Sequence, residues 1–486
     1  MFALHALHQF DLRRLIGTLV VSLACLANLQ NGLMAQQHEL VIHGGRVMDP
    51  ESGLDAIRDC GIDAGVITAI SAEPLSGRQS IDARGLVVAP GFIDLHQHAW
   101  DETSLRLKAL DGCTSVLELE VGTAEVAEWY AQRQGSSRLH FGVSIGHIPV
   151  RMQVMGDAPA FLPPAGARAI SQPATEADIK AMAERIAAGL TAGAVAVGFG
   201  FAYTPAASDA EITAMFEQAA RRQASCHIHL GGRGKEGQTQ QFVLDTVQLA
   251  RATGAAIHCV HFQAGARDQM GPLLHMIEAL RDEGQDISIE CYPWTAGMTE
   301  IQSAIFDPGF QQRLGIDYAD IRYGGQPLSA ESFEQYRRQG GLVIVQNNTE
   351  AAVRLAVEHP LMMIASDGLL GHPRNAGTYA RVLGKYVREQ GGLELMAALQ
   401  KMSLMPAERL QTLAPMMARK GRVQVGCDAD LTLFDPQTVA EQATFAEPLR
   451  PSQGIHWVLV SGTPVVREGQ LVEDVFPGQG VRSDRR

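Results

Sequence analysis

Paired cysteines and concentrated positive charge are both missing from this sequence. The 486 residues include seven cysteines, whose spacing is not that of a disulfide framework or a zinc knuckle. We therefore expect no essential disulfide, with Cys60 and the five cysteines after it mostly buried as thiols in apolar strands. The formal net charge of −13 argues against a nucleic-acid-binding protein, because such proteins usually carry clustered Lys and Arg.

A long apolar run is also missing. The apolar stretch at residues 15–29 is short for a membrane span. Arg13 and Arg14 precede it, and small residues up to Ala35 follow, which is the pattern of a secretory signal peptide. We expect residues 1–35 to be removed and the mature chain to be exported, periplasmic or extracellular, without a stable membrane span. The alternative is a retained membrane anchor or an N-terminal helix.

Short β-rich runs occur near both ends of the remaining chain, separated by Gly, Asp and Pro turns. The two groups share the same style of strand and turn. We therefore expect residues 36–89 and 415–486 to form one β-sandwich domain. The runs are residues 40–42, 61–70, 80–88, 430–434, 457–460 and 464–466.

The middle of the chain, residues 90–414, alternates apolar runs with amphipathic helices, which is typical of βα units around a parallel sheet. Eight runs fit the strands of an α/β fold, a closed (β/α)8 TIM-type barrel, which takes roughly 250 residues or more. Residues 306–345 look like an insertion over the face where the strands end. The eight runs are residues 91–96, 114–120, 139–146, 194–199, 225–230, 256–262, 287–292 and 362–367.

Two of the helices have recognisable starts. Ser208 and Glu211 have the spacing of a capping box, in which the serine bonds the third amide and the glutamate bonds back to the serine amide. A second helix begins near Thr175. Both fall between predicted strands, as the barrel requires.

Two histidines end the first predicted strand, in the motif His96-Gln97-His98. In an extended strand residues i and i+2 share a face, so both imidazoles point the same way. Neutral imidazoles bind zinc well. The pair therefore supplies half of a metal site.

Further ligand candidates close other predicted strands, where the side chains of a barrel converge. These are His229, His261 and Asp367. His227 shares a face with His229 one pleat lower, so we assign it to the core or to a supporting position. His258 lies three residues before His261, which predicts that it points the opposite way.

Several longer motifs match a known family. The chain resembles the amidohydrolase superfamily, and within it the N-acyl-D-amino-acid deacylase (D-aminoacylase) group, over nearly all of its mature length. This resemblance implies a metal-dependent barrel with a split β-sandwich domain. The motifs are residues 89–98 (APGFIDLHQH), 292–297 (YPWTAG), 366–368 (SDG), 372–374 (HPR), 381–384 (RVLG) and 426–431 (GCDADL).

The resemblance also implies a role for each candidate ligand. It makes His96, His98, His229, His261 and Asp367 the ligands of one or two zinc ions. Asp367 is implied to be catalytic as well, as the group that moves protons during hydrolysis.

The sequence departs from the family at two ligand positions. Deacylases of this group are expected to have a cysteine ligand where this chain has Val121, and many relatives use a carboxylated lysine that residues 193–199 do not contain. Glu120, or alternatively Glu118, is a hard oxygen donor that can bridge two metal ions. Two acids in an apolar strand are costly to bury without such a partner, so we expect ligation; the alternative is a surface-facing edge.

A third departure concerns the substrate. The deacylases have a lysine two residues after His261, suited to a substrate carboxylate, but this chain has Gln263 there. Arg374 can replace that charge with a bidentate contact; the alternative is a salt bridge on a loop. Tyr292 and Thr299 are the other candidates for substrate binding, although an aromatic side chain at a strand end is as often part of the packing.

Together these features predict a zinc-dependent hydrolase that cleaves a linear, non-peptide C–N amide bond in a small molecule, with metal-activated water as the nucleophile. An N-acyl-(D-)amino acid is the expected substrate. The alternatives are a cyclic-amide hydrolase of the dihydroorotase or hydantoinase kind, or a dipeptidase. In a different class, the barrel would be a catalytically silent metal-binding protein, but the intact ligand set argues against decay.

Overall fold

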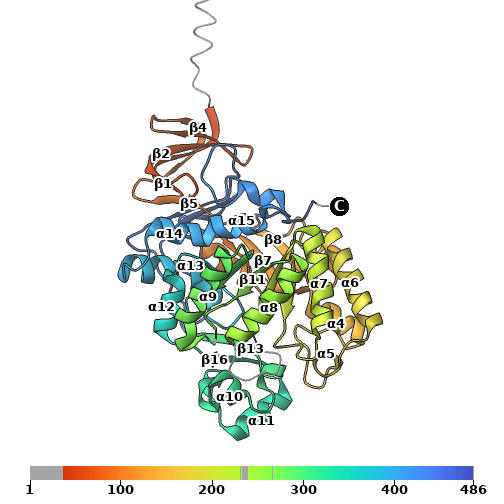
Figure 1. Cartoon of the computed structure of the whole chain (residues 1–486). Coiled ribbons are helices and arrows are strands. Elements are labelled where there is room, and N and C mark those ends of the chain that lie inside the picture. The colour runs from red at the N-terminus through yellow and green to blue at the C-terminus, as the bar shows by residue number, and fades with distance from the viewer. Residues whose placement is uncertain (1–36, 230, 232–238, 265, 485–486) are drawn as a thin grey trace, which may run out of the picture.

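The computed structural model describes residues 37–229, 231, 239–264 and 266–484 (Figure 1). The predicted signal peptide, residues 1–35, lies outside these residues. Within the described part, no helix is both long enough and apolar enough to cross a bilayer. The six cysteines in this part, from Cys60 onward, are free and buried.

Eight parallel strands form the central sheet. They follow one another in chain order around it, and each overlaps the run predicted from the sequence. A parallel bridge between Gln97 and Gly368 joins the first strand segment to the last, with the amide of His98 donating to the carbonyl of Gly368 at 3.0 Å. The sheet therefore closes into the predicted barrel. Its strands are β6 (Phe92–Asp94), β7 (Cys113–Thr123), β8 (His140–Gly146), β9 (Ala196–Gly200), β10 (Ser225–His229), β11 (Ala256–Val260), β12 (Ile287–Cys291) and β17 (Met362–Ile364).

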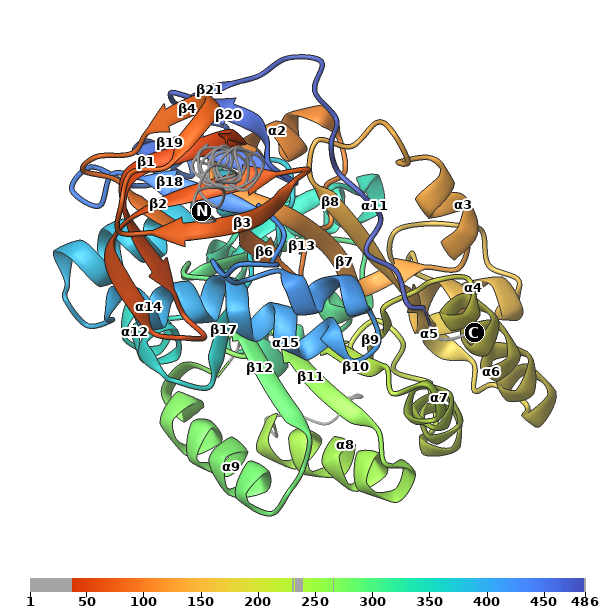
Figure 2. The same ribbon diagram turned by 90° about the horizontal axis from the view of Figure 1, so that it is seen from above.

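Helices surround this barrel, as the view from above shows (Figure 2). Their apolar faces pack on the outward-facing residues of the strands in one large core. The principal helices are α2 (Glu102–Leu110), α3 (Val126–Ala131), α4 (His147–Met155), α5 (Arg168–Ser171), α6 (Glu176–Thr191), α7 (Asp209–Arg222), α8 (Thr239–Thr253), α9 (Met270–Asp282), α12 (Glu350–Glu358), α13 (Arg374–Arg381), α14 (Leu395–Leu399) and α15 (Met405–Gln411). Two π-helical segments, Val382–Glu389 and Gln400–Leu404, and short 3-10 turns at Arg267–Gln269 and Pro415–Arg419 complete the set.

One predicted helix start is only half correct. The Ser208 hydroxyl caps α7 by accepting the amide of Glu211 at 3.2 Å. The Glu211 side chain does not bond back. It is buried instead against α4, where it lies 2.7 Å from His147 Nε2 and pairs with Arg151. Glu211 thus satisfies a buried arginine, whereas α6 has a complete capping box between Thr175 and the third helical residue.

Both chain ends contribute to a second sheet of nine strands. Strand β5 lies between β1 and β18, so it joins the N-terminal strands to the C-terminal ones. This arrangement confirms a barrel accompanied by a β-domain that both ends of the chain build. The strands are β1 (Gln37–Asp49), β2 (Leu54–Asp63), β3 (Val66–Ser71), β4 (Ser76–Asp82), β5 (Val87–Pro90), β18 (Leu431–Phe434), β19 (Ile455–Val460), β20 (Thr463–Arg467) and β21 (Gln470–Leu471).

The insertion between β12 and β17 forms a small unit with its own core and its own four-stranded sheet. It lies at the opposite end of the molecule from the sheet of the chain ends (Figure 1). It begins at β13, earlier than predicted. Its elements are β13 (Ala296–Glu300), a 3-10 turn (Ala304–Phe306), α10 (Phe310–Leu314), a second 3-10 turn (Tyr318–Asp320), β14 (Ile321–Tyr323), β15 (Gln326–Pro327), α11 (Ala330–Gln339) and β16 (Leu342–Gln346).

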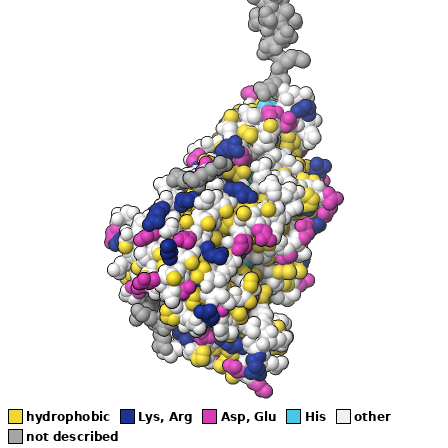
Figure 3. Space-filling model, turned by 90° about the vertical axis from the view of Figure 1, so that its right-hand side faces the viewer, with side chains coloured by type: hydrophobic (Ala, Val, Ile, Leu, Met, Phe, Trp, Pro, Cys, Tyr) yellow, Lys and Arg dark blue, Asp and Glu magenta, His cyan; other side chains and the backbone are white. Residues whose placement is uncertain are grey.

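Charged side chains of both signs are interspersed on the face that Figure 3 shows. Some form exposed ion pairs, such as Arg46 with Asp55 at 2.7 Å. Exposed pairs of this kind stabilise a protein by at most about 1 kcal/mol each.

Candidate metal centre

The six predicted ligands converge where the barrel strands end. His96 and His98 follow β6, and Glu120 lies within β7; His229, His261 and Asp367 lie at or just beyond the ends of three other strands. Their donor atoms form two groups that share Glu120. The four-residue group is His96, His98, Glu120 and Asp367, and the three-residue group is Glu120, His229 and His261.

The four-residue group is compact. Nε2 of His96 lies 2.9 Å from Nε2 of His98 and 2.6 Å from Oε2 of Glu120. Nε2 of His98 lies 3.1 Å from the same glutamate oxygen. Oδ1 of Asp367 lies 3.6 Å from Nε2 of His96 and 3.3 Å from Nε2 of His98. Four donor atoms thus face one point.

The three-residue group uses the other oxygen of the shared carboxylate. Oε1 of Glu120 lies 2.7 Å from Nδ1 of His229 and 3.9 Å from Nε2 of His261. The two imidazole nitrogens are 2.9 Å apart. Glu120 therefore presents one oxygen to each group, which is the geometry of a bridging ligand.

These separations, from 2.6 to 3.9 Å, lie around the spacing of ligands on a divalent metal ion. Nitrogen and oxygen donors about 2.0–2.2 Å from a tetrahedral zinc ion lie roughly 3.3 Å from one another. The donor set of imidazoles and carboxylates is also one that zinc accepts. Two imidazole nitrogens that face each other at 2.9 Å, as in both groups, have no reason to do so unless a proton or a cation lies between them.

The electrostatics of the site favour positive charge at these points. Burial alone would lower the pKa of His96, but nearby carboxylates, first Asp367 and Glu120, raise it to about 10. Burial alone would raise the pKa of Glu120, but His229 and His96 hold it well below its ordinary range. A bound divalent ion would supply the charge that these groups favour.

Asp367 also contacts a buried arginine. Its Oδ2 lies 2.8 Å from Nη1 of Arg374, whose guanidinium stacks on the ring of Tyr292 with 4.7 Å between the guanidinium carbon and the ring centre. Burial would raise the pKa of Asp367, but Arg374 and His96 lower it below its ordinary range. The carboxylate therefore stays ionised.

Two of the predicted ligands have a strained backbone. Asp367 has a φ of +50° and His261 a φ of +33°. Residues other than glycine rarely adopt a positive φ. Strain of this kind is typical of functional sites, where the surrounding structure maintains it. At His261 it turns the chain directly after β11, so the imidazole points into the barrel mouth.

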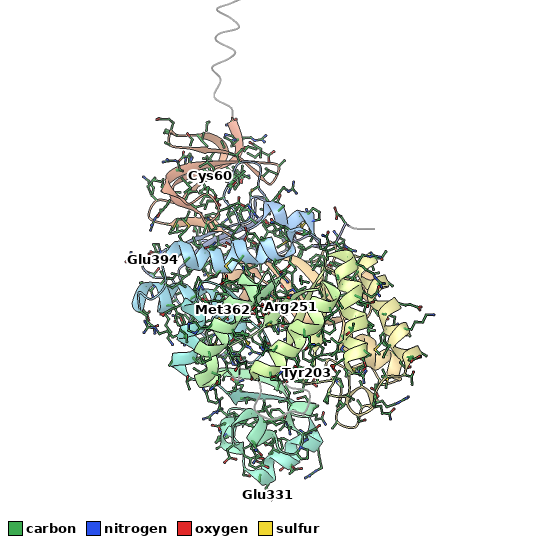
Figure 4. All side chains as sticks on the ribbon, viewed as in Figure 1. Cys60, Tyr203, Arg251, Glu331, Met362 and Glu394 are labelled. Atoms are coloured by element: carbon green, nitrogen blue, oxygen red, sulfur yellow. The ribbon has the colours of Figure 1, made fainter. Side chains whose placement is uncertain are left out.

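A cavity opens beside the two groups, between the barrel and the insertion. Tyr292 and Thr299, both predicted to bind substrate, line it. Tyr203, labelled in Figure 4, also lines it, and its hydroxyl lies 3.4 Å from that of Thr299. Arg374 is not among the lining residues; it is fully buried behind Asp367. The apolar part of the lining includes Val121, Phe161, Leu162, Met298, Ile305, Phe306, Leu314, Val345 and Leu369.

Comparison with known proteins agrees with this geometry. The model of the amidohydrolase family matches residues 79–466. The chain belongs to the amidohydrolase family. An N-acyl-D-glutamate deacylase of Alcaligenes xylosoxydans xylosoxydans is 30% identical over 93% of this amidohydrolase and 98% of its own length.

Two solved structures are similar to the whole amidohydrolase fold. An N-acyl-D-glutamate deacylase from Bordetella bronchiseptica, in complex with zinc and a phosphonate mimic of the tetrahedral intermediate, has a TM-score of 0.78 and 27% identity over 92% of this chain and 100% of its own. A D-aminoacylase described as having a binuclear metal centre has a TM-score of 0.78 and 25% identity over the same shares. Membership of this family makes the chain a hydrolase of C–N bonds, and the residues at the barrel mouth are its candidate metal centre.

The structure of this amidohydrolase distinguishes the two glutamates, Glu118 and Glu120, that the sequence left as alternative ligands. Glu120 has both oxygens on the ligand groups. Glu118 instead lies behind the site, with Oε2 2.7 Å from Nδ1 of His98 and Oε1 accepting the amide of Val121 at 3.1 Å. Val121, where the resemblance implies a cysteine, lines the cavity.

Sequence reasoning missed Glu290 and misplaced His258. Oε1 of Glu290 lies 2.6 Å from Nδ1 of His96, and Oε2 lies 3.0 Å from Nε2 of His258. The prediction that His258 points away from the site is wrong, because the strand ends at Val260 and the chain turns at His261. The signal for Glu290 was present, since it is an acid in the apolar strand β12 and needs a partner when buried.

Proposed function

We propose that this amidohydrolase is an exported deacylase that removes the acyl group from N-acyl amino acids, with a D configuration preferred, and that zinc is its metal. The observation that carries the proposal is the pair of ligand groups that share Glu120 beside a cavity. The relatives named as N-acyl-D-glutamate deacylase and D-aminoacylase support the substrate class. The signal-like sequence of residues 1–35 supports export into the periplasm or outside the cell.

The ligand groups supply the setting for hydrolysis. When bound to them, divalent ions would lower the pKa of water and polarise the carbonyl oxygen of the amide. His96, His98, Glu120 and Asp367 would hold one ion, while His229 and His261 complete the second position with Glu120.

Asp367 acts as the proton carrier. Its carboxylate is ionised, lies at the cavity and has one oxygen facing the ligand group. It takes the proton of the attacking water, acting as a general base. It then gives that proton to the leaving nitrogen, acting as a general acid.

The cavity walls bind the rest of the substrate. The hydroxyls of Tyr292 and Thr299 are placed to bond the polar groups of an acyl amino acid. Arg374 contacts Asp367 and the Tyr292 ring rather than open space, so its direct bond to a substrate carboxylate stays a prediction. The immediate effect of Arg374 is to hold Asp367 and Tyr292 in place.

A substrate panel tests the proposal. The zinc-loaded protein is incubated with N-acetyl derivatives of D- and L-amino acids, with a five-membered cyclic amide and with a dipeptide, and the release of amine or ring opening is measured. We expect turnover of the D-acyl amino acids, abolished by chelator and reduced about 10²–10⁴-fold in Asp367→Asn. Turnover of only the cyclic amide or the dipeptide would replace the deacylase assignment by one of those activities.

A further inference from the structure

Helix α13, which begins at Arg374, is broken after its first turn. Gly377 has a φ of −149° and a ψ of 23°, which is not a helical conformation. A break of this kind leaves the backbone amides that follow it without acceptors inside the helix. Asp111, directly after α2, supplies the acceptors: Oδ2 accepts the amide of Tyr379 at 2.8 Å, and Oδ1 accepts that of Ala380 at 3.0 Å. The second part of α13 is therefore capped by the end of α2.

The first part of α13 is held by the other end of α2. Nδ2 of Asn375 donates to the hydroxyl of Ser104 at 3.0 Å. Between this bond and the cap, Leu107 lies in one buried apolar cluster with Ala376. Ser104, Leu107 and Asp111 are spaced by three and four residues, so they lie on one face of α2 and its end. That face therefore contacts α13 on both sides of its break.

The polar contacts between the two helices are shut off from water. Ser104, Asp111 and Asn375 are each 0% exposed. Oδ1 of Asp111 also accepts the hydroxyl of Ser452 at 2.7 Å. Oδ1 of Asn375 accepts a bond from Nε2 of Gln97 at 3.1 Å. Since a buried polar group that loses its partner is costly, these bonds fix the position of α13 relative to α2.

Arg374 is the side chain whose direction depends on this arrangement. Its guanidinium has few hydrogen bonds of its own: among the described residues Nε is buried without a partner, and Nη2 reaches the carbonyl of Met298 only at 3.4 Å. The ion pair of Nη1 with Asp367 at 2.8 Å therefore depends on where the backbone of α13 begins. Asn375 is the next residue along that backbone, so its bond to α2 bears directly on Arg374.

We propose that α2 is a clamp, formed by Ser104, Leu107 and Asp111, that aims Arg374 at Asp367. Asp111 is then a positioning residue for hydrolysis, although it neither lines the cavity nor belongs to a ligand group. The proposal rests on the proton-carrying role given to Asp367 under the proposed function. It does not depend on which amide is the substrate.

A double-mutant cycle in kcat tests the clamp. Asp111→Asn and Arg374→Gln are made singly and together, and turnover of an N-acetyl-D-amino acid by the zinc-loaded enzyme is measured. The pH is about 8.5, because burial raises the pKa of the Asp111 carboxyl to about 7 and the cap needs the ionised form. We expect Asp111→Asn to lower kcat about 10–100-fold with little change in KM, since a misplaced reacting group costs rate.

The combined variant separates positioning from general destabilisation. If Asp111 acts through Arg374, adding Asp111→Asn to Arg374→Gln should lower kcat by less than about twofold further, because the two effects are not independent. The same loss of kcat with and without Arg374→Gln would overturn the proposal. It would mean that Asp111 acts on the enzyme as a whole.

The chain offers a matched control in Asp49. This aspartate is also 0% exposed, and it accepts the amides of Ser52 and Val423, both at 2.9 Å, together with the hydroxyl of Ser52. It lies in β1, within the sheet of the chain ends. Asp49→Asn should leave kcat within about twofold of the wild type, as expected for a distant, independent site. A loss as large as in Asp111→Asn would contradict a specific role for α2.

A measurement without substrate tests the clamp independently of the reaction. In protein labelled with ¹⁵N-arginine, the Nε–H signal of Arg374 is identified by its loss in Arg374→Gln, and its exchange with water is followed. We expect exchange to be at least about tenfold faster in Asp111→Asn. Ser104→Ala, which removes the acceptor of Asn375, should have the same effect and serves if Asp111→Asn does not fold.

The exchange rates also distinguish failure of the clamp from failure of the proposed function. Exchange at the wild-type rate in the folded clamp variants would overturn the clamp. Faster exchange in these variants but not in Asp49→Asn, in an enzyme that turns over no acyl amino acid, would support the clamp and overturn only the proposed function.

Discussion

Nη1 of Arg374 lies 2.8 Å from Oδ2 of Asp367, and the guanidinium is fully buried. The arginine lowers the pKa of the carboxyl against the effect of burial. In Arg374→Gln the pKa of Asp367 should rise, so the acid limb of the pH–kcat profile should move to higher pH by about 1–3 units.

The control for this prediction is Arg374→Lys, which keeps a positive charge but not the planar contact with Tyr292. Its acid limb should move less than that of Arg374→Gln. An acid limb that is identical in the wild type and in Arg374→Gln would contradict the role given to this ion pair.

The sequence predicted the barrel and most of the residues of the candidate metal centre because both leave local signals. Each strand is a short apolar run, and a ligand at the end of such a run is visible as a polar residue closing it, as for His229 and Asp367. The closure of the barrel follows from the number of these runs. Fold and ligand positions are thus encoded within segments of a few residues.

The sequence could not decide between Glu118 and Glu120. They are two residues apart in β7 and share a face, so periodicity treats them alike. The pairing of β7 with β8 shifts register after Glu118. Backbone amides there, including that of Val121, donate hydrogen bonds to the Glu118 carboxylate instead. The bond between Glu290 and His96 joins residues 194 positions apart, a relationship that no local pattern contains.

Glu120 is expected to be needed for both metal positions, since each of its oxygens faces a different group. We expect about two zinc ions per chain in the wild type and one or none in Glu120→Ala. Elemental analysis of the purified proteins measures this directly. Glu118→Ala is the control, because it should weaken zinc binding without removing a ligand. Unchanged zinc content in Glu120→Ala would exclude the bridging role of Glu120.

The lining of the cavity predicts a preference for apolar substrates. Among the described residues that line it there is no lysine or arginine, and the apolar wall includes Phe161, Ile305 and Leu314. Burying a side-chain carboxylate there without a partner would cost several kcal/mol. We therefore expect kcat/KM for N-acetyl-D-methionine to exceed that for N-acetyl-D-glutamate at least about tenfold, since 1.4 kcal/mol corresponds to a factor of ten.

A charge placed in this wall should alter the preference. Leu314→Arg supplies a cation at the cavity and should reduce the ratio of the two kcat/KM values, whereas Leu314→Met should leave it nearly unchanged. A wild-type preference for N-acetyl-D-glutamate would show that the apolar wall does not select the side chain.

The stability of the contact between the barrel and the β-domain should depend on pH through Asp430. This residue precedes β18 and lies 3.1 Å from Nε2 of His140 in β8, and it also pairs with Lys420. Burial alone would raise its pKa, but His140 and Lys420 hold it below its ordinary 3.8. The stabilisation is therefore present above about pH 4, the pKa of an unfolded aspartate, and decreases as the pH falls further.

Asp430→Asn tests this pH dependence. At pH 7 the variant should be less stable than the wild type by about 3 kcal/mol, because it leaves Lys420 buried with only part of its pairing. The difference should shrink as the pH falls from about 5 to 3, because the wild-type carboxylate is then losing its advantage over the unfolded state. Urea unfolding followed by circular dichroism at each pH measures it. The control is Asp55→Asn, which removes an exposed ion pair with Arg46 and should change stability by less than about 1 kcal/mol. A constant difference in stability between Asp430→Asn and the wild type across this pH range would contradict the role given to Asp430.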